Sequence, residues 1–169
     1  MGQGVDGVLV GSPRAAGTLD NLAATYATAI ASTNGQAKGF LVSKVAPTLR
    51  IGQRVLYLGD FDWCGHQIEQ HSRRTIAEHT GVYERPWERI ALTAEQVQEN
   101  DLPVISKADR RYRPTRYFDA VETEAFGQAR IVAAVRNRLD ELMPEPIGDV
   151  LERHERQRTS VAEQLRGIE

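Results

Sequence analysis

The sequence has little cysteine, no long apolar run and no strong net charge, and each absence excludes a class of protein. Cys64 is the single cysteine among 169 residues, so no intrachain disulfide can form, which fits a reducing compartment. No apolar run approaches the roughly 18 residues that a membrane-spanning helix needs. Residues 1–6 lack the basic and then apolar pattern of a signal peptide. We therefore expect a cytoplasmic protein without membrane contact.

The formal charge of −2 at pH 7 also restricts the partners. A protein that coats nucleic acid by charge alone is usually strongly basic, so any contact with DNA or RNA needs a local basic patch together with a metal ion. The hydrophobic content of 41% and the charged content of 26% are typical of folded domains. A chain of 169 residues suits one domain with a single core.

Apolar patterns alternate between strand and helix periods along the chain. They predict strands over 7–11, 54–59 and 87–92, and helices over 18–31, 40–49, 66–79, 126–142 and 149–166. Gly81 is expected to end the helix over 66–79, and Thr93, with Glu95 and Gln96 close behind, is expected to start a further short helix. Because strands alternate with helices, we predict an α/β fold with a mainly parallel central sheet flanked by helices. Along 126–142 the expected apolar face is Phe126, Ala129, Val132, Ala133, Arg136 and Leu139.

Pro144 and Pro146 end the long amphipathic helix. We therefore predict a domain over 1–143 and a C-terminal helical extension over 144–169. The helix of the extension is polar with few apolar anchors, so we expect it to be peripheral or to dock a protein partner.

Asp60 and Asp62 follow the most apolar strand of the chain. Residues two apart in an extended chain point to the same side, so both carboxylates are predicted to face one pocket beyond the carboxyl end of the sheet. The helix that starts near Gly65 presents N–H groups that favour phosphate. Because Mg²⁺ prefers carboxylate oxygens, we predict that Asp60 and Asp62 hold Mg²⁺ or Mn²⁺. The alternative is that the pair only caps a turn and the helix.

Two segments together resemble Toprim domains, which occur in topoisomerases, bacterial primases and several nucleases. Segment 56–68 reads LYLGDFDWCGHQI, and segment 88–97 reads ERIALTAEQV. Both are similar to the Toprim segment of type IIB topoisomerase A subunits and of related phage- and plasmid-borne proteins, over roughly residues 7 to 140. The resemblance implies a Toprim-like (Rossmann-like) fold, catalytic and metal-binding roles for Asp60 and Asp62, and Mg²⁺-dependent processing of nucleic-acid phosphodiesters, nuclease-like or topoisomerase-related.

The first strand departs from the family pattern, because Gly11, Ser12 and Pro13 stand where Toprim enzymes place a glutamate. General-base catalysis contributes roughly 10²–10⁴-fold, so the loss leaves two readings open: an enzyme, or a catalytically impaired module that binds nucleic acid or a protein partner. Glu122 and Glu124 lie where relatives carry an acidic-apolar-acidic segment and are candidates for a third ligand or for catalytic assistance. The alternative is a solvent-exposed strand edge or helix start.

A basic loop is predicted over 102–116, after the second segment. Its candidate nucleic-acid contacts are Lys107, Arg110, Arg111, Arg113 and Arg116. Such loops contact phosphates and stack bases, although most basic loops only face solvent. Trp63 is a candidate for stacking on a base or sugar, with packing beneath the loop as the alternative. These residues predict DNA or RNA as the partner.

A phosphatase of the haloacid-dehalogenase type is a third reading, because that family also uses Asp-x-Asp after a strand. It places Gly-Thr directly after the pair, near the start of the chain. Here a strand and a helix precede the pair, and Trp63 and Cys64 follow it.

Overall fold

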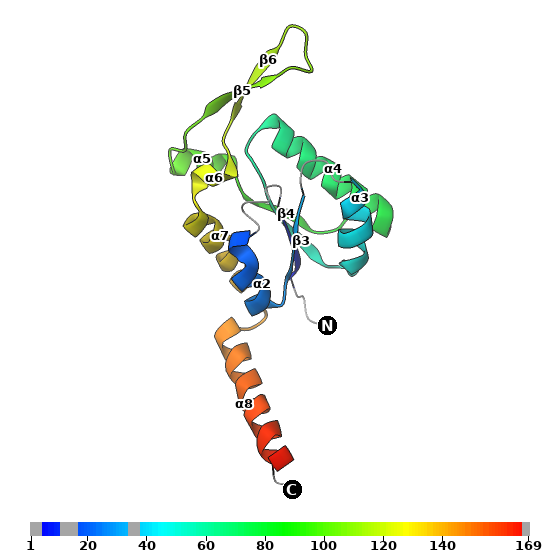
Figure 1. The fold of residues 1–169 in the computed structure, drawn as a ribbon, viewed down its shortest axis with the longest axis vertical. Helices are drawn as coiled ribbons and strands as arrows, with labels where there is room; N and C mark the ends of the chain where they lie inside the picture. The colour runs from blue at the N-terminus through cyan, green and yellow to red at the C-terminus, as the bar shows by residue number, and fades with distance from the viewer. Residues whose placement is uncertain (1–4, 11–16, 34–37, 167–169) are drawn as a thin grey trace.

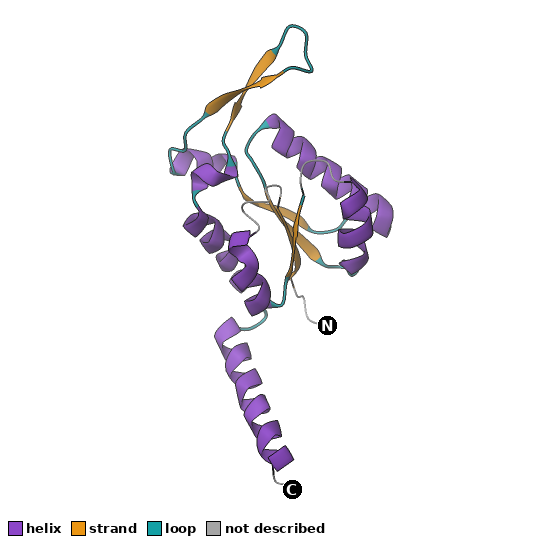
Figure 2. Cartoon of the chain, in the orientation of Figure 1, coloured by secondary structure: helices purple, strands orange, loops and turns teal. Residues whose placement is uncertain are grey.

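A parallel sheet forms the centre of the molecule. The computed structural model describes residues 5–10, 17–33 and 38–166. The strands are β1 (Val5–Val10), β2 (Ala29–Ser32), β3 (Arg54–Leu58) and β4 (Trp87–Ala91), and their order in the sheet is β2-β1-β3-β4. All three neighbouring pairs run parallel. Helices cover both faces (Figures 1 and 2), so the prediction of an α/β fold is confirmed.

β3 separates two hydrophobic cores. Its side chains alternate between the faces of the sheet, as in any strand. Leu56 and Leu58 are buried with residues of α2 (Asp20–Tyr26) and α7 (Gln128–Leu142). The other core contains Val55 and Tyr57, with Ile76 of α4 (Trp63–Thr80) and Leu41 of η2 (Leu41–Val45), a π-helical turn. Burial on both faces explains why the sequence of this strand is almost entirely apolar.

The prediction of one helix over 18–31 is wrong in its second half. A 3₁₀ turn η1 (Gly17–Leu19) leads into α2, which ends at Tyr26. Ala27 then adopts a left-handed conformation with φ of 50°, and β2 begins at Ala29. β2 pairs with β1 so that Ile30 lies opposite Val8. Alanine and isoleucine at these spacings suit a helix face or a strand, and the pairing with β1 decides between them.

The prediction of a loop over 102–116 is wrong for residues 105–109 and for Arg116, which lie in strands, while 102–104 and 110–115 have no regular structure. The two strands, β5 (Ile105–Asp109) and β6 (Arg116–Ala120), form an antiparallel hairpin in which Lys107 pairs with Phe118. Within the two strands only Ala120 is buried, so neither strand has the apolar alternation by which strands are recognised. The hairpin projects from the body at the end where β3 and β4 finish (Figure 1).

Local end signals were read correctly for two helices. Gly81 ends α4 with φ of 70°, as predicted. α5 (Ala94–Glu99) begins with a capping box in which Thr93 and Gln96 bond reciprocally to each other's backbone. The helix predicted over 40–49 is instead three short turns: α3 (Lys38–Phe40), η2, and the 3₁₀ turn η3 (Ala46–Thr48), which includes Pro47.

The apolar face predicted over 126–142 is wrong in part. A turn at Gly127, with φ of 83°, separates α6 (Thr123–Phe126) from α7, so the helical phase restarts at Gln128. Ala129, Ala133 and Arg136 are consequently exposed. The buried residues of these two helices that face the core are Phe126, Ile131, Val135 and Leu139.

α8 (Ile147–Arg166) is the predicted C-terminal helix. It extends away from the body at the end opposite the hairpin (Figure 1), and none of its described residues is buried. Among the residues that the structure describes, no helix has the length and apolarity needed to cross a membrane.

Candidate functional site

The site lies at the carboxyl edge of the sheet, where β3 ends. Phe61 and Val121 form an isolated antiparallel bridge, with N–H···O distances of 2.9 and 3.0 Å. This bridge brings the segment before α6 beside the Asp60–Asp62 turn. Glu122 and Thr123 therefore lie next to Asp60, although more than 60 residues separate them along the chain.

Asp60 is held by α6. Its Oδ1 accepts hydrogen bonds from the backbone N–H and from the hydroxyl of Thr123, both at 2.8 Å. Thr123 is fully buried, so this contact fixes the carboxylate with respect to the core. Asp60 is partly exposed.

Asp62 has two roles. Its Oδ1 accepts from the backbone N–H of Gly65 at 2.6 Å and caps α4, and its Oδ2 accepts from Lys107 Nζ at 3.0 Å. The side chain is only 7% exposed. Gly65 is required here, because a Cβ at this position would collide with the carbonyl oxygen of Asp60. The capping alternative raised from the sequence is therefore real for Asp62, and it uses one of the two oxygens.

Lys107 forms ion pairs with two of the carboxylates at this edge, those of Asp62 and Glu122. Its ammonium is 3.0 Å from Asp62 Oδ2 and 3.4 Å from Glu122 Oε1. Burial opposes the charge of this ammonium, but the hydrogen bond to Asp62 and the nearby charges of Asp60 and Glu122 outweigh it and raise the pKa of Lys107. We call Asp60, Asp62 and Glu122 the carboxylate cluster. Glu124 lies exposed in the first turn of α6.

The cluster fits a cation in donor chemistry. Its oxygens are the hard ligands that Mg²⁺ prefers, and a positive group is already held between Asp62 and Glu122. Within the described residues, however, no group of three or more His, Cys, Asp or Glu side chains is arranged to hold a metal ion. A divalent ion would therefore need Lys107 to leave, and it would rely on few carboxylates plus water, as Mg²⁺ often does.

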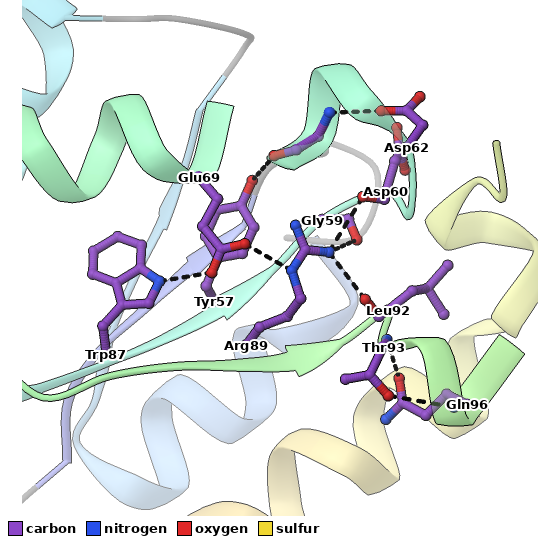
Figure 3. Close-up of polar contacts among 11 residues, drawn as sticks. Tyr57, Gly59, Asp60, Asp62, Glu69, Trp87, Arg89, Leu92, Thr93 and Gln96 are labelled. Atoms are coloured by element: carbon purple, nitrogen blue, oxygen red, sulfur yellow. Dashed lines mark hydrogen bonds and ion pairs between the residues drawn. The ribbon is translucent and has the colours of Figure 1, made fainter. Parts of the chain in front are cut away.

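Arg89 of β4 holds the ends of two neighbouring strands at the carboxyl edge of the sheet. The sequence alone did not single out this residue. Its guanidinium donates to Glu69 at 2.7 Å and to three backbone oxygens at 3.0–3.2 Å (Figure 3). Those oxygens belong to Gly59, Asp60 and Leu92. The guanidinium also lies 5.1 Å from the ring centre of Tyr57. One arginine thus ties the ends of β3 and β4 to α4.

Two of the predicted phosphate contacts are already paired. Lys107 is bound in the cluster, and Arg111 Nε lies 2.8 Å from Asp109 Oδ1. The hydrogen bond from Arg111 lowers the pKa of Asp109. Arg110 and Arg113 are exposed and form no ion pair within the described parts of the chain. The positive charge available to a partner is therefore at the tip of the hairpin.

Trp63 contacts the hairpin. Its ring lies nearly parallel to that of Phe118, with centroids 6.3 Å apart and an interplanar angle of 15°. Phe118 also contacts Tyr112, whose ring is covered by the guanidinium of Arg116 at 4.6 Å. Packing beneath the hairpin, the alternative raised for Trp63, is thus observed, yet 47% of the residue remains exposed.

Comparison with known proteins adds no relative: no protein-family model, no curated protein and no solved structure matches the chain.

Proposed function

We propose that this chain is a Toprim-like module that processes phosphodiesters of DNA or RNA with Mg²⁺ or Mn²⁺ held by Asp60 and Asp62. The observation that carries the proposal is the convergence of Asp62 and Glu122 on the Lys107 ammonium, with Asp60 beside them, at the carboxyl edge of a parallel sheet. Open α/β sheets bind their ligands at this edge. The sequence resemblance to Toprim domains points to the same aspartates.

In this proposal, Lys107 holds the cation position until a divalent ion takes it. Asp60 and Asp62 would then bind the ion, and Glu122 would assist from the adjacent segment. When bound, the ion neutralises charge on the reacting phosphate. The released Lys107 remains on the hairpin beside the cluster, where its ammonium can pair with a phosphate oxygen instead of a carboxylate.

The hairpin provides the contact to the nucleic-acid backbone. Arg110, Arg113 and Arg116 are exposed and project with the hairpin beyond the carboxyl edge. Exposed arginines bind phosphate oxygens through bidentate hydrogen bonds and supply affinity without sequence preference. A backbone held by the hairpin would pass close to the carboxylate cluster at its base.

The second candidate is a binding module without catalysis. Two observations favour it: one oxygen of Asp62 is used to cap α4, and Lys107 neutralises the other. The segment after β1, where Toprim enzymes place a glutamate, contains no acidic residue over 11–16 and lies outside the described residues. Such a module would still bind nucleic acid through the hairpin, or a protein through α8.

The test is cleavage of single-stranded RNA and of supercoiled plasmid with Mg²⁺ or Mn²⁺. The variants are Asp60→Asn and Asp62→Asn, and the matched control is Glu163→Gln, which removes an exposed carboxylate in α8. The proposal predicts cleavage by the wild type and by the control, with a loss of about a hundredfold or more in either aspartate variant.

Cleavage that survives both aspartate substitutions contradicts the proposal. Binding of nucleic acid without cleavage supports the second candidate. Release of phosphate from small phosphoesters, without cleavage of polymers, supports the phosphatase reading.

A further inference from the structure

A cavity of about 170 Å³ lies between the hairpin and the start of α4. Its lining residues are Asp62, Trp63, Cys64, Lys107, Ala108, Asp109, Arg111 and Phe118. It adjoins the carboxylate cluster, since Asp62 belongs to both, and Lys107, which contacts Asp62 and Glu122, also lines the cavity. The nucleic-acid backbone invoked above passes beside this cavity, but the proposed function does not use it.

Two aromatic rings form walls of the cavity. The rings of Trp63, in α4, and Phe118, in β6, are nearly parallel, although the two residues are far apart in the sequence. Packing against Phe118 holds the Trp63 ring in a fixed orientation while 47% of the residue stays exposed. Leaving so large an apolar surface in water is unfavourable, and its orientation provides a flat face on which a planar ligand can stack.

The charges around the cavity cancel each other. Lys107 is paired with Asp62, and Arg111 is paired with Asp109 through both carboxylate oxygens. While Lys107 stays paired with Asp62 and no divalent ion is bound, a free phosphate entering the cavity would meet two carboxylates as well as two cations, so the cavity then has no net attraction for an anion. A neutral ligand is favoured, provided that it is flat and carries hydrogen-bonding groups for these polar side chains.

We propose that this cavity binds one unpaired nucleobase, stacked on Trp63. The inference rests on the proposed function and narrows its substrate to single-stranded or locally unpaired nucleic acid, because a base inside a duplex offers neither its face nor its edge. The hairpin arginines hold the backbone, and the cavity takes the base of an adjacent nucleotide. Recognition by stacking tolerates any base.

The test compares two labelled oligonucleotides of equal length and charge: oligothymidine, and an abasic deoxyribose-phosphate chain. Binding is measured by fluorescence anisotropy with Mg²⁺ at one salt concentration, and the recovered strands are checked for cleavage. The variants are Trp63→Ala and Trp63→Phe. The matched control is Tyr83→Ala, which removes an exposed aromatic residue beyond the C-terminal end of α4.

We expect the wild type to bind oligothymidine more tightly than the abasic chain. Trp63→Ala should weaken oligothymidine binding by about five- to a hundredfold, the range for loss of one stacked base, and leave abasic binding unchanged. Trp63→Phe keeps an aromatic face and should retain most of the affinity, which separates stacking from a folding defect. Tyr83→Ala should bind both chains as the wild type does.

Two results would overturn the inference. Equal affinity of the wild type for the two chains, or an equal loss for both in Trp63→Ala, removes the base-binding cavity but leaves the proposed function intact. Binding of neither chain, together with no binding of oligouridine of the same length, overturns the nucleic-acid partner itself, and with it both proposals.

Discussion

The carboxyl edge of the sheet and the hairpin above it both carry charge, but they use it in different ways. At the edge, Arg89 and Glu69 have side chains only 12% and 16% exposed, and they pair with each other. On the hairpin, Arg110 and Arg113 are exposed, and within the described residues they form no ion pair. Partly buried, paired charges fix the chain in place, whereas exposed ones remain free for a partner.

Lys107 belongs to both regions. It is a hairpin residue, but its ammonium is bound to carboxylates of the edge. The difference between the two regions therefore predicts that substitutions at the edge reduce stability, and that substitutions on the hairpin reduce binding.

Arg89→Leu should have the largest effect. It leaves Glu69 without its cation in a mostly buried place and removes the donor from three backbone oxygens. We expect a loss of about 3–5 kcal/mol in the free energy of unfolding, measured by urea denaturation. Arg74→Leu is the matched control, because the Arg74 side chain is 70% exposed. Equal midpoints for the two variants would show that the Arg89 contacts do not stabilise the edge.

Two substitutions of Asp62 should separate the stabilisation that comes from helix capping from that which comes from the charge. Asp62→Ala removes the cap of α4 and should lower the free energy of unfolding by about 1–2 kcal/mol. Asp62→Asn keeps a good N-cap and should lower it by about half as much or less, while still removing the charge that binds Lys107. Thermal or urea unfolding of both variants checks this. An equal loss in the two variants would mean that charge, and not capping, gives Asp62 its structural role.

Glu88→Gln should have a smaller effect that depends on pH. Glu88 of β4 bonds to Arg138 of α7 at 2.6 Å and to Arg54 of β3 at 3.0 Å. The hydrogen bond from Arg138 is the main reason that the pKa of Glu88 lies below its ordinary 4.5, against the opposing effect of burial. A carboxyl whose pKa is lowered by folding stabilises the protein above its unfolded pKa and loses that contribution as the pH falls through the folded pKa.

We therefore expect Glu88→Gln to lower the free energy of unfolding by about 1 kcal/mol at neutral pH. The gap to the wild type should shrink as the pH falls below 4.5. Urea midpoints measured across this pH range check the prediction. A gap that stays constant or widens in acid would contradict the assigned ion pairs.

Removal of residues 147–169 should have the smallest effect on stability. No described residue of α8 is buried, so the deletion removes no core contact. We expect the free energy of unfolding to change by no more than about 0.5 kcal/mol. A large drop, or loss of cooperative unfolding, would show that α8 packs on the body or on a second molecule in solution.

Local signals in the sequence were sufficient for part of the fold. The apolar run of β3, the glycine that ends α4 and the capping box of α5 act within a few residues, and each was predicted. β2 and the hairpin were missed because strand pairing joins distant residues. β2 had a helix-compatible spacing, and the hairpin strands are too exposed to show alternation.

The candidate site could likewise be predicted only where its signals are local in the sequence. Asp60 and Asp62 stand out because they follow a buried strand, but their metal role stays a prediction. The contact between Lys107 and Asp62 spans 45 residues and depends on the hairpin, so no local pattern contains it. Arg89 lies inside segment 88–97, which resembles Toprim domains. An arginine in a strand that is predicted to belong to the central sheet is itself a signal, because a charge that becomes buried there requires partners.

The most direct test of the central claim is the affinity for Mn²⁺, measured by electron paramagnetic resonance on the wild type, Lys107→Gln and Asp62→Asn. If Lys107 holds the cation position of the carboxylate cluster, Lys107→Gln should bind Mn²⁺ about tenfold more tightly than the wild type, because a competing positive charge is gone. Asp62→Asn should lose binding. Equal Mn²⁺ affinity in all three proteins, or no binding by Lys107→Gln, would contradict the account.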